Sequence, residues 1–145
     1  MDLVAMTLLE LTQLAHVAAT LYMVGLIWFV QIVHYPGFAL VGGDAFVPYT
    51  REHVRRTGWV VGPPMLLEAA TAVLLVVLLP TSPLAWTGLG LLALIWASTA
   101  LLQVPAHSRL NEAHDAPIID RLVRTNWLRT TAWTTRGLLA LALLI

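Results

Sequence analysis

Residues 103–136, QVPAHSRLNEAHDAPIIDRLVRTNWLRTTAWTTR, hold most of the polar chemistry of an otherwise apolar chain. This stretch leaves one hydrophobic segment, crosses a polar loop with His107 and His114, and enters a second apolar segment that still carries Asn126, Arg129 and Arg136. An arginine near the middle of a bilayer costs roughly 2.5 to 3.5 kcal/mol on insertion scales, so it usually faces protein or water. The stretch therefore predicts a buried functional site, which the apolar segments in the rest of the chain are expected to surround.

The composition of the whole chain indicates an integral membrane protein. Its 145 residues are 59% hydrophobic and 11% charged, with a mean hydropathy of +0.79, whereas an average soluble domain is about 45 to 50% apolar. The absence of cysteine excludes disulfides and thiolate metal sites. A net charge of zero gives no support for a nucleic-acid partner. The lipid bilayer is the expected partner.

Four apolar stretches have about the length that a bilayer crossing needs, which is about 20 residues. They cover residues 8–34, 59–79, 84–104 and 122–145. Only residues 80–83 join the second stretch to the third, so these two helices must be antiparallel neighbours. We find no internal repeat and no linker. The predicted fold is all-α, an integral membrane antiparallel four-helix bundle that forms a single domain over residues 1–145.

The arginines of the loops predict the orientation of this bundle. The first loop carries Arg51, Arg55 and Arg56, the third carries Arg109 and Arg121, and the second carries none. By the positive-inside rule the first and third loops are cytoplasmic, and both chain termini are periplasmic.

The first apolar stretch contains His16 and His34, which a regular helix would place on the same face but about 27 Å apart along its axis. Pro36 disfavours helical geometry in the residue before it, so the helix is expected to end at residues 35–37. Residues 45–58 alternate apolar and charged side chains. They predict either an amphipathic helix at the membrane surface or an extension of the second span.

The second apolar stretch places a carboxylate inside the membrane. Pro63 and Pro64 predict a kink there. Glu68 lies some 13 Å beyond Trp59, at a depth where an isolated carboxylate takes up a proton or finds a cation. A metal ion held by nearby histidines and the side chain of Arg136 are two candidate partners, and both stay open.

Two polar stripes follow in the second half of the chain. If the third helix continues past Pro105, one side of it presents Gln103, His107, Asn111 and His114. Asp115 is the expected N-cap of the fourth helix. One face of that helix carries Asn126, Arg129, Trp133 and Arg136.

Four short strings carry a resemblance to a known family. They are HYPGF at 34–38, GPPMLLE at 62–68, QVPAH at 103–107 and NWLRT at 126–130. With its length and four spans, the chain resembles the small bacterial membrane proteins grouped as anthrone-oxygenase-like domains of unknown function. The resemblance implies a bacterial inner membrane and oxidative chemistry on a lipophilic substrate. It provides no catalytic template that could be transferred residue by residue.

The inward polar residues predict a cavity open to the cytoplasm. Three imidazoles and one carboxylate suit Fe, Cu, Zn or Mn, and the predicted ligands are His34, His53, His107 and Glu68. Haem is a weaker alternative, with His34 and either His53 or His107 as axial ligands. Predicted cofactor contacts come from the amides Gln31, Gln103 and Asn126, and predicted catalytic groups are Glu68, Arg129 and Arg136.

The sequence leaves two classes of function open, an enzyme and a transporter. In the first, the metal performs redox or hydrolytic chemistry on a lipophilic small molecule that enters between helices. In the second there is no metal. Glu68, Arg136, Asn126 and Arg129 then bind an anionic solute or relay protons in a small carrier or channel that forms a homo-oligomer.

Overall fold

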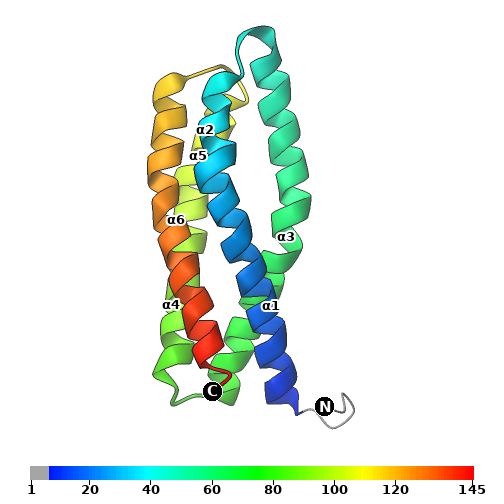
Figure 1. Cartoon of the computed structure of the whole chain (residues 1–145), viewed down its shortest axis with the longest axis vertical. Helices are drawn as coiled ribbons and strands as arrows, with labels where there is room; N and C mark the ends of the chain where they lie inside the picture. Colours follow the sequence, from blue (N-terminus) through cyan, green and yellow to red (C-terminus); the bar gives the residue numbers. More distant parts are fainter. Residues whose placement is uncertain (1–6) are drawn as a thin grey trace.

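The computed structural model describes residues 7–145, and within that range it contains helices and no strand. Long helical segments span Leu8–Leu40, Gly43–Leu78 and Pro83–Leu110, and helix α6 spans Ala116–Ala142. They lie side by side and alternate in direction (Figure 1). The predicted all-α fold is thus confirmed.

The first segment does not end at its proline. Helix α1 (Leu8–Phe29) passes into the π-helical turn η2 (Val30–His34), and α2 (Tyr35–Gly37) and the 3-10 turn η3 (Phe38–Leu40) follow. In the π turn the N–H of Tyr35 donates to the carbonyl of Val30. Pro36 is the second residue of α2, in the first turn, where a missing N–H costs little. The α-helix therefore ends at Gly37, within the predicted range 35–37, but Pro36 does not end it, and the 3-10 turn η3 extends the segment to Leu40.

The third segment repeats this arrangement. Helix α4 (Pro83–Ser98) passes into the π turn η5 (Thr99–Gln103), which is followed by α5 (Val104–Leu110). Here the N–H of Val104 donates to the carbonyl of Thr99, directly before Pro105. The helix continues past this proline, but it ends at Leu110, so His114 does not share a helical stripe with His107.

The second and fourth segments are single long helices. After the 3-10 turn η4 (Gly43–Ala45), α3 runs over Phe46–Leu78 and includes both the charged run and the two prolines. Residues 45–58 therefore extend the second helix and do not form a separate surface helix. Helix α3 changes direction about halfway along (Figure 1), as expected for internal prolines. Helix α6 starts as predicted, because the side chain of Asp115 accepts the N–H of Ile118 at 3.1 Å.

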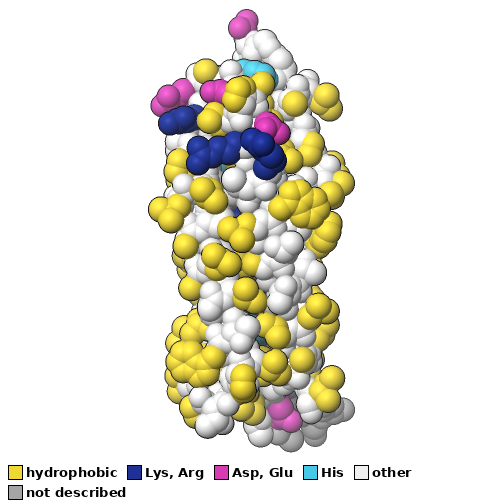
Figure 2. All heavy atoms as spheres, turned by 90° about the vertical axis from the view of Figure 1, so that its left-hand side faces the viewer, with side chains coloured by type: hydrophobic (Ala, Val, Ile, Leu, Met, Phe, Trp, Pro, Cys, Tyr) yellow, Lys and Arg dark blue, Asp and Glu magenta, His cyan; other side chains and the backbone are white. Residues whose placement is uncertain are grey.

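The packing puts α1 against α3 and α6, and α4 against α6 and α3. Helix α1 begins and α6 ends at the same end of the molecule, which we call the terminal end (Figure 1). At the opposite end, called the charged end, lie the helical turns of α3, α5 and α6 that carry the arginines at positions 51, 55, 56, 109 and 121. On the face drawn in Figure 2, the basic side chains gather at that end.

Three of the long segments are apolar and long enough to cross a membrane, namely the first, second and third. Helix α6 is not one of them, because Arg129 and Arg136 interrupt its apolar sequence. Large apolar side chains lie on the outside of the helices, with Trp59 76% and Leu101 72% exposed. Such an exterior is compatible with a protein that lies in a membrane.

Candidate functional site

Three of the five histidines meet near the charged end, each from a different segment. The Nε2 atom of His34 lies 2.7 Å from Nδ1 of His53, and their ring centroids are 4.4 Å apart. The ring centroid of His107 lies 5.3 Å from that of His53. The predicted gathering of these imidazoles is confirmed. His114 stands apart, exposed and with its ring against Phe46.

Neutral hydroxyl groups hold the histidines in place. The hydroxyl of Tyr35 lies 3.1 Å from Nε2 of His107, and that of Thr57 lies 3.0 Å from Nδ1 of His53. The Nδ1 atom of His107 is buried and has no hydrogen-bond partner. Sequence reasoning missed Tyr35, because its place before a proline was interpreted only as a helix end. Its position next to His34 was the available signal.

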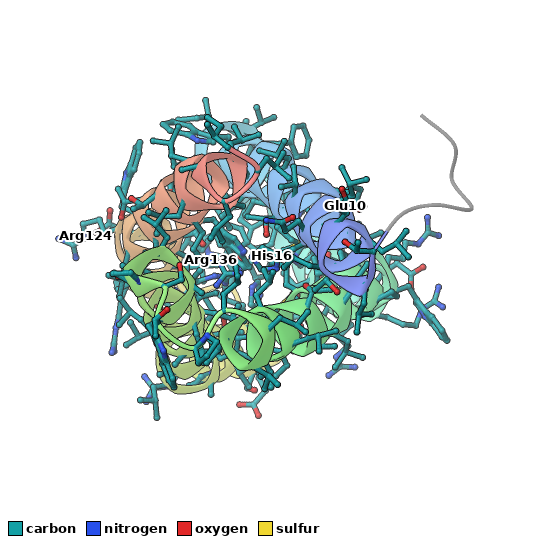
Figure 3. All side chains as sticks on the ribbon, turned by 90° about the horizontal axis from the view of Figure 1, so that it is seen from below. Glu10, His16, Arg124 and Arg136 are labelled. Atoms are coloured by element: carbon teal, nitrogen blue, oxygen red, sulfur yellow. The ribbon has the colours of Figure 1, made fainter. Side chains whose placement is uncertain are left out.

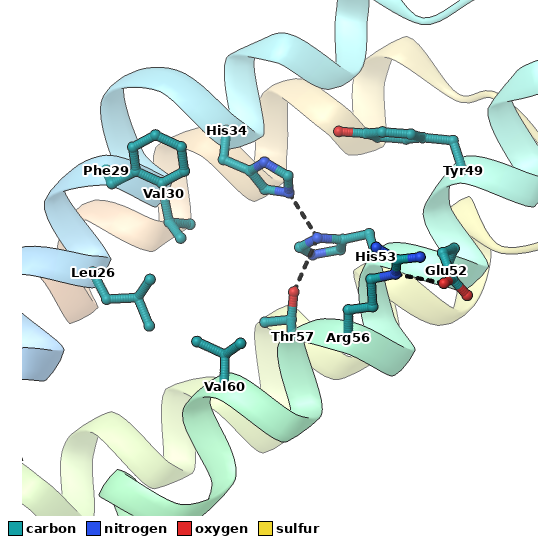
Figure 4. A pocket seen from close by; sticks show the side chains of 10 residues that line it. All are labelled: Leu26, Phe29, Val30, His34, Tyr49, Glu52, His53, Arg56, Thr57 and Val60. Carbon is teal, nitrogen blue, oxygen red and sulfur yellow. Dashed lines mark hydrogen bonds and ion pairs between the residues drawn. The ribbon is translucent and has the colours of Figure 1, made fainter.

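A cavity of about 520 Å³, which we call the outer cavity, lies between the first segment and α3. His34 and His53 form part of its wall, and an exposed ion pair of Glu52 with Arg56 lies at its edge (Figure 4). Most of the surface of this cavity is apolar. The full lining is Leu26, Phe29, Val30, His34, Tyr49, Glu52, His53, Arg56, Thr57 and Val60.

A second space of about 190 Å³, which we call the inner cavity, lies between the helices. Its polar wall consists of Tyr35, His53, Gln103, His107 and Arg129, and its other side chains are mainly apolar. The outer and inner cavities share four lining residues, which are Leu26, Val30, His53 and Thr57. His53 therefore belongs to both spaces.

Arg129 is the buried cation of the inner cavity. It is 8% exposed, and its Cζ atom lies 5.2 Å from the ring centroid of Trp133. Its guanidinium also lies beside the hydroxyl of Tyr35. The Nε atom has no hydrogen-bond partner. Arg129 thus lines one cavity with His53 and His107, as predicted. The cavity is mainly apolar, however, and it is not lined by four other residues predicted there, Gln31, Glu68, Asn126 and Arg136.

Glu68 and Arg136 form a buried ion pair on the terminal side of Trp133, as one of the two sequence alternatives predicted. Arg136 Nη2 lies 3.2 Å from Oε1 of Glu68, and the two side chains are 1% and 0% exposed. The indole N–H of Trp133 donates to Oε2 of the same carboxylate at 3.0 Å. Arg136 also donates to the carbonyl of Gly88. Figure 3 shows Arg136 pointing into the middle of the bundle.

The prediction that Glu68 joins the histidines around a metal ion is wrong. Both of its carboxylate oxygens already accept hydrogen bonds from Trp133 and Arg136. Glu68 follows His53 by 15 residues on α3, which corresponds to roughly 22 Å along a helix. The predicted depth of Glu68 was measured from Trp59. His53 lies further from Glu68 than Trp59 does, because it belongs to the charged extension of the same helix.

His16 lies in a separate buried contact on the terminal side. Its Nδ1 is 2.8 Å from the hydroxyl of Thr71. Together with Arg136 it lines a space of only about 10 Å³, and both side chains point inward in Figure 3. His16 and His34 both contact α3, through Thr71 and His53, as expected if they lie on the same face of the first segment, although that segment passes through the π turn η2.

The three predicted cofactor-binding amides bond to the protein itself. Gln31 donates to the carbonyl of Val123 at 3.2 Å, and its oxygen accepts from Asn126 at 2.9 Å and from Thr130 at 3.3 Å. Gln103 accepts from Ser98 and donates to Thr125. Gln31 and Asn126 thus join the first segment to α6. Gln103 also lines the inner cavity, where it remains a candidate contact.

Within residues 7–145, no three or more His, Asp or Glu side chains are already arranged as ligands of one metal ion. The histidine cluster therefore stays a candidate that needs side-chain adjustment to bind metal. No family model, curated protein or solved structure matches the chain. The resemblance to anthrone-oxygenase-like proteins accordingly stays a prediction.

Proposed function

We propose that the chain is a membrane-embedded enzyme of the oxidoreductase or oxygenase type that acts on a lipophilic substrate. The observation that carries this proposal is the outer cavity, a mainly apolar space of about 520 Å³ whose wall contains the hydrogen-bonded pair His34 and His53. Its size lies in the range of small-molecule sites, about 300 to 1,000 Å³. An apolar substrate could enter it laterally from a bilayer and meet the imidazoles there.

The proposal includes the bacterial inner membrane, four crossings and a cytoplasmic charged end. Three segments have the length and hydropathy of a membrane span. In α6 the interrupting residues Asn126, Arg129 and Arg136 are buried against protein. They would not contact lipid if α6 crossed as the fourth helix, so their polarity does not oppose a crossing.

The histidine cluster would provide the reactive groups. A neutral imidazole accepts a proton from a bound substrate, and the mutual hydrogen bond of His34 and His53 allows that proton to be shared. Three imidazoles without a carboxylate suit Fe, Cu or Zn, and Mn less well. A bound metal would supply the redox chemistry. The chain's own residues would bind and orient the substrate.

A metal fits this cluster only after a small movement. His34 Nε2 and His53 Nδ1 are 2.7 Å apart, which is a hydrogen-bond distance. Two nitrogens that bind one ion at 2.0 to 2.1 Å lie roughly 3.3 Å apart in tetrahedral geometry. The two rings would therefore separate by about half an ångström. His107 would exchange its bond with Tyr35 for the metal.

Elemental analysis and a visible spectrum of the protein, purified without chelator, test the metal. We expect His34→Ala and His107→Ala each to remove most of it, because both imidazoles belong to the cluster. His16→Ala and the exposed His114→Ala are controls and should retain it. Occupancy should fall only when the pH drops below roughly 6.5, since imidazole binds metal only when neutral and the metal competes with the proton. Absence of Fe, Cu, Zn, Mn and haem, before and after titration, would contradict the metal.

A substitution that fills the outer cavity tests whether lipophilic molecules bind there. Val60 lines the cavity and is 43% exposed, so Val60→Trp should fill the space without disturbing the core. We expect this variant to lose lipophilic molecules that co-purify with the natural protein, as detected by mass spectrometry of organic extracts. Val77→Trp is the matched control, because Val77 lies on α3, is 67% exposed and lines neither cavity. Equal losses in both variants would contradict the proposal.

The second candidate function is a small carrier for an anionic solute or for protons. The buried Arg129, which lines the inner cavity, favours it. The closed Glu68–Arg136 pair opposes it, because the neighbouring space of about 10 Å³ leaves no room for a solute. Anion or proton flux into liposomes that contain the purified chain would favour the carrier over the enzyme.

A further inference from the structure

The two buried arginines of α6 differ in whether they have an anionic partner in the chain. Arg136 is 1% exposed and pairs with Glu68. Arg129 lies two turns earlier and is 8% exposed, yet it takes part in none of the ion pairs among residues 7–145. Burial of an unpaired cation is strongly unfavourable, so a buried cation normally has an anionic partner.

The neighbours of Arg129 do not neutralise its charge. The hydroxyl of Tyr35 and the indole ring of Trp133 are both uncharged, although the ring face offers a cation–π contact. The carboxylates of α3 and α6 are committed to other arginines: Glu52 to Arg55 and Arg56, Glu68 to Arg136, and Asp120 to Arg124. The positive charge is thus left for a group from outside the chain.

The inner cavity provides space for such a group beside Arg129. Arg129 and His107 both line this space. Nε of Arg129 and Nδ1 of His107 are buried and have no hydrogen-bond partner in the chain. Gln103 adds an amide to the same wall. A compact head group with oxygen acceptors would bind the guanidinium of Arg129, since a guanidinium binds a carboxylate through two parallel hydrogen bonds.

The rest of the ligand must be apolar. The inner cavity of about 190 Å³ is too small for a whole substrate. It shares Leu26, Val30, His53 and Thr57 with the outer cavity of about 520 Å³, which is mainly apolar. The two cavities are therefore adjacent, and a ligand with its head group at Arg129 would have to pass between these four side chains to place an apolar body in the outer cavity.

We propose that Arg129 binds the oxygen-anion head group, such as a carboxylate, of a lipophilic molecule whose body occupies the outer cavity. This inference rests on the lipophilic substrate proposed above and names its chemical class. In this arrangement His53, which lines both cavities, lies beside the part of the ligand where the head group joins the apolar chain.

The binding test uses the full chain in nanodiscs of phosphatidylcholine, with oleate and oleyl alcohol as probes, measured by titration calorimetry. A hydrogen-bonded charge pair contributes about tenfold to a hundredfold in affinity. We expect oleate to bind at least about tenfold more tightly than the alcohol. Arg129→Gln should abolish this preference. Equal binding of the two probes, or an unchanged preference in Arg129→Gln, would overturn the proposal.

Two further variants test whether the preference for oleate depends on a positive charge at position 129 or on charge elsewhere on α6. Arg129→Lys keeps the charge and should retain part of the preference for oleate. Arg124→Gln is the matched control, because Arg124 lies on the same helix and forms an exposed pair with Asp120. It should bind both probes as the natural chain does. Loss of the preference in Arg124→Gln would show that surface charge explains it, and the proposal would fail.

Thermal stability gives a readout that does not depend on a probe. Arg129→Met removes an unpaired buried charge and keeps the length of the side chain, so without ligand its Tm should equal or exceed that of the natural chain. Arg136→Met leaves Glu68 unpaired and should lower the Tm. If Arg129→Met lowered the Tm by as much, Arg129 would have a partner within the chain and the proposal would be wrong.

Failure of this proposal can be distinguished from failure of the enzyme proposal. If the chain binds no metal and shows no turnover but still prefers oleate through Arg129, only the enzymatic function fails. If it binds metal through His34 and His107 but does not distinguish oleate from the alcohol, only the anionic head group fails.

Discussion

Trp133 makes two different contacts through the two parts of its ring system. Its N–H donates to Glu68 at 3.0 Å, and its ring lies 5.2 Å from the Cζ atom of Arg129. The sequence placed Arg129, Trp133 and Arg136 on one face of α6, which is confirmed by their burial. Spacing alone could not show which arginine pairs with Glu68, since that depends on how α3 lies against α6.

The Glu68–Arg136 pair leads to a prediction at the level of single residues. Glu68→Gln or Arg136→Met alone leaves a buried charge without its partner, which costs about 3 to 5 kcal/mol. The double variant removes both charges and should lose less than the sum of the single losses. Melting temperatures in detergent, measured for all four proteins, give the coupling. Additive losses would argue against the pair.

The π turns are the element-level feature that sequence reasoning could not supply. Both precede a proline, Pro36 or Pro105, and both contain a buried glutamine, Gln31 or Gln103. A proline normally argues for a helix end. Here the wider turn lets the helix continue and changes the phase of all later residues, so a period of 3.6 residues misplaces them. That is why the helix end predicted at Pro36 did not account for the helical turns that follow it.

The contact between α1 and α6 depends on Gly137. A Cβ atom added there would lie 3.1 Å from Val24 and 3.4 Å from Leu21. We therefore expect Gly137→Val to destabilise the fold by about 1 to 3 kcal/mol through overpacking, measured as a lower Tm in detergent.

Gly90→Ala on α4 is the control for this prediction. A Cβ atom at Gly90 meets nothing within 4 Å, and alanine favours helix over glycine by about 0.8 to 1 kcal/mol. The control should keep or raise the Tm. A Gly137→Val variant as stable as the natural chain would contradict the close approach of the two helices.

At the scale of the whole molecule, hydropathy predicted the number of helices but not their bounds. The charged extension of α3 over residues 46–58 is helical although it is polar, and α6 is a full-length helix although arginines interrupt it. The gathering of His34, His53 and His107 at one end followed from helix order alone. The inner cavity did not, because its walls come from side-chain packing among all the long segments.

The orientation in the membrane is a prediction for the whole chain. Helix α1 begins and α6 ends at the terminal end, away from the arginines (Figure 1). By the positive-inside rule this end faces the periplasm. A C-terminal reporter that is active only in the cytoplasm should therefore stay silent, whereas a periplasmic reporter at the same position should be active. The reverse pattern would contradict the orientation.

The position of Trp133 has a consequence for a membrane that carries a proton gradient. Trp133 lies between two charged side chains: Glu68 accepts its N–H, and Arg129 lies over its ring. An indole donates one hydrogen bond through its nitrogen and accepts none there, so it does not pass a proton onward. Trp133 would thus insulate the bundle. Trp133→His should make liposomes that contain the chain leak protons, seen as faster decay of an imposed pH difference, whereas Trp133→Phe should leave them tight.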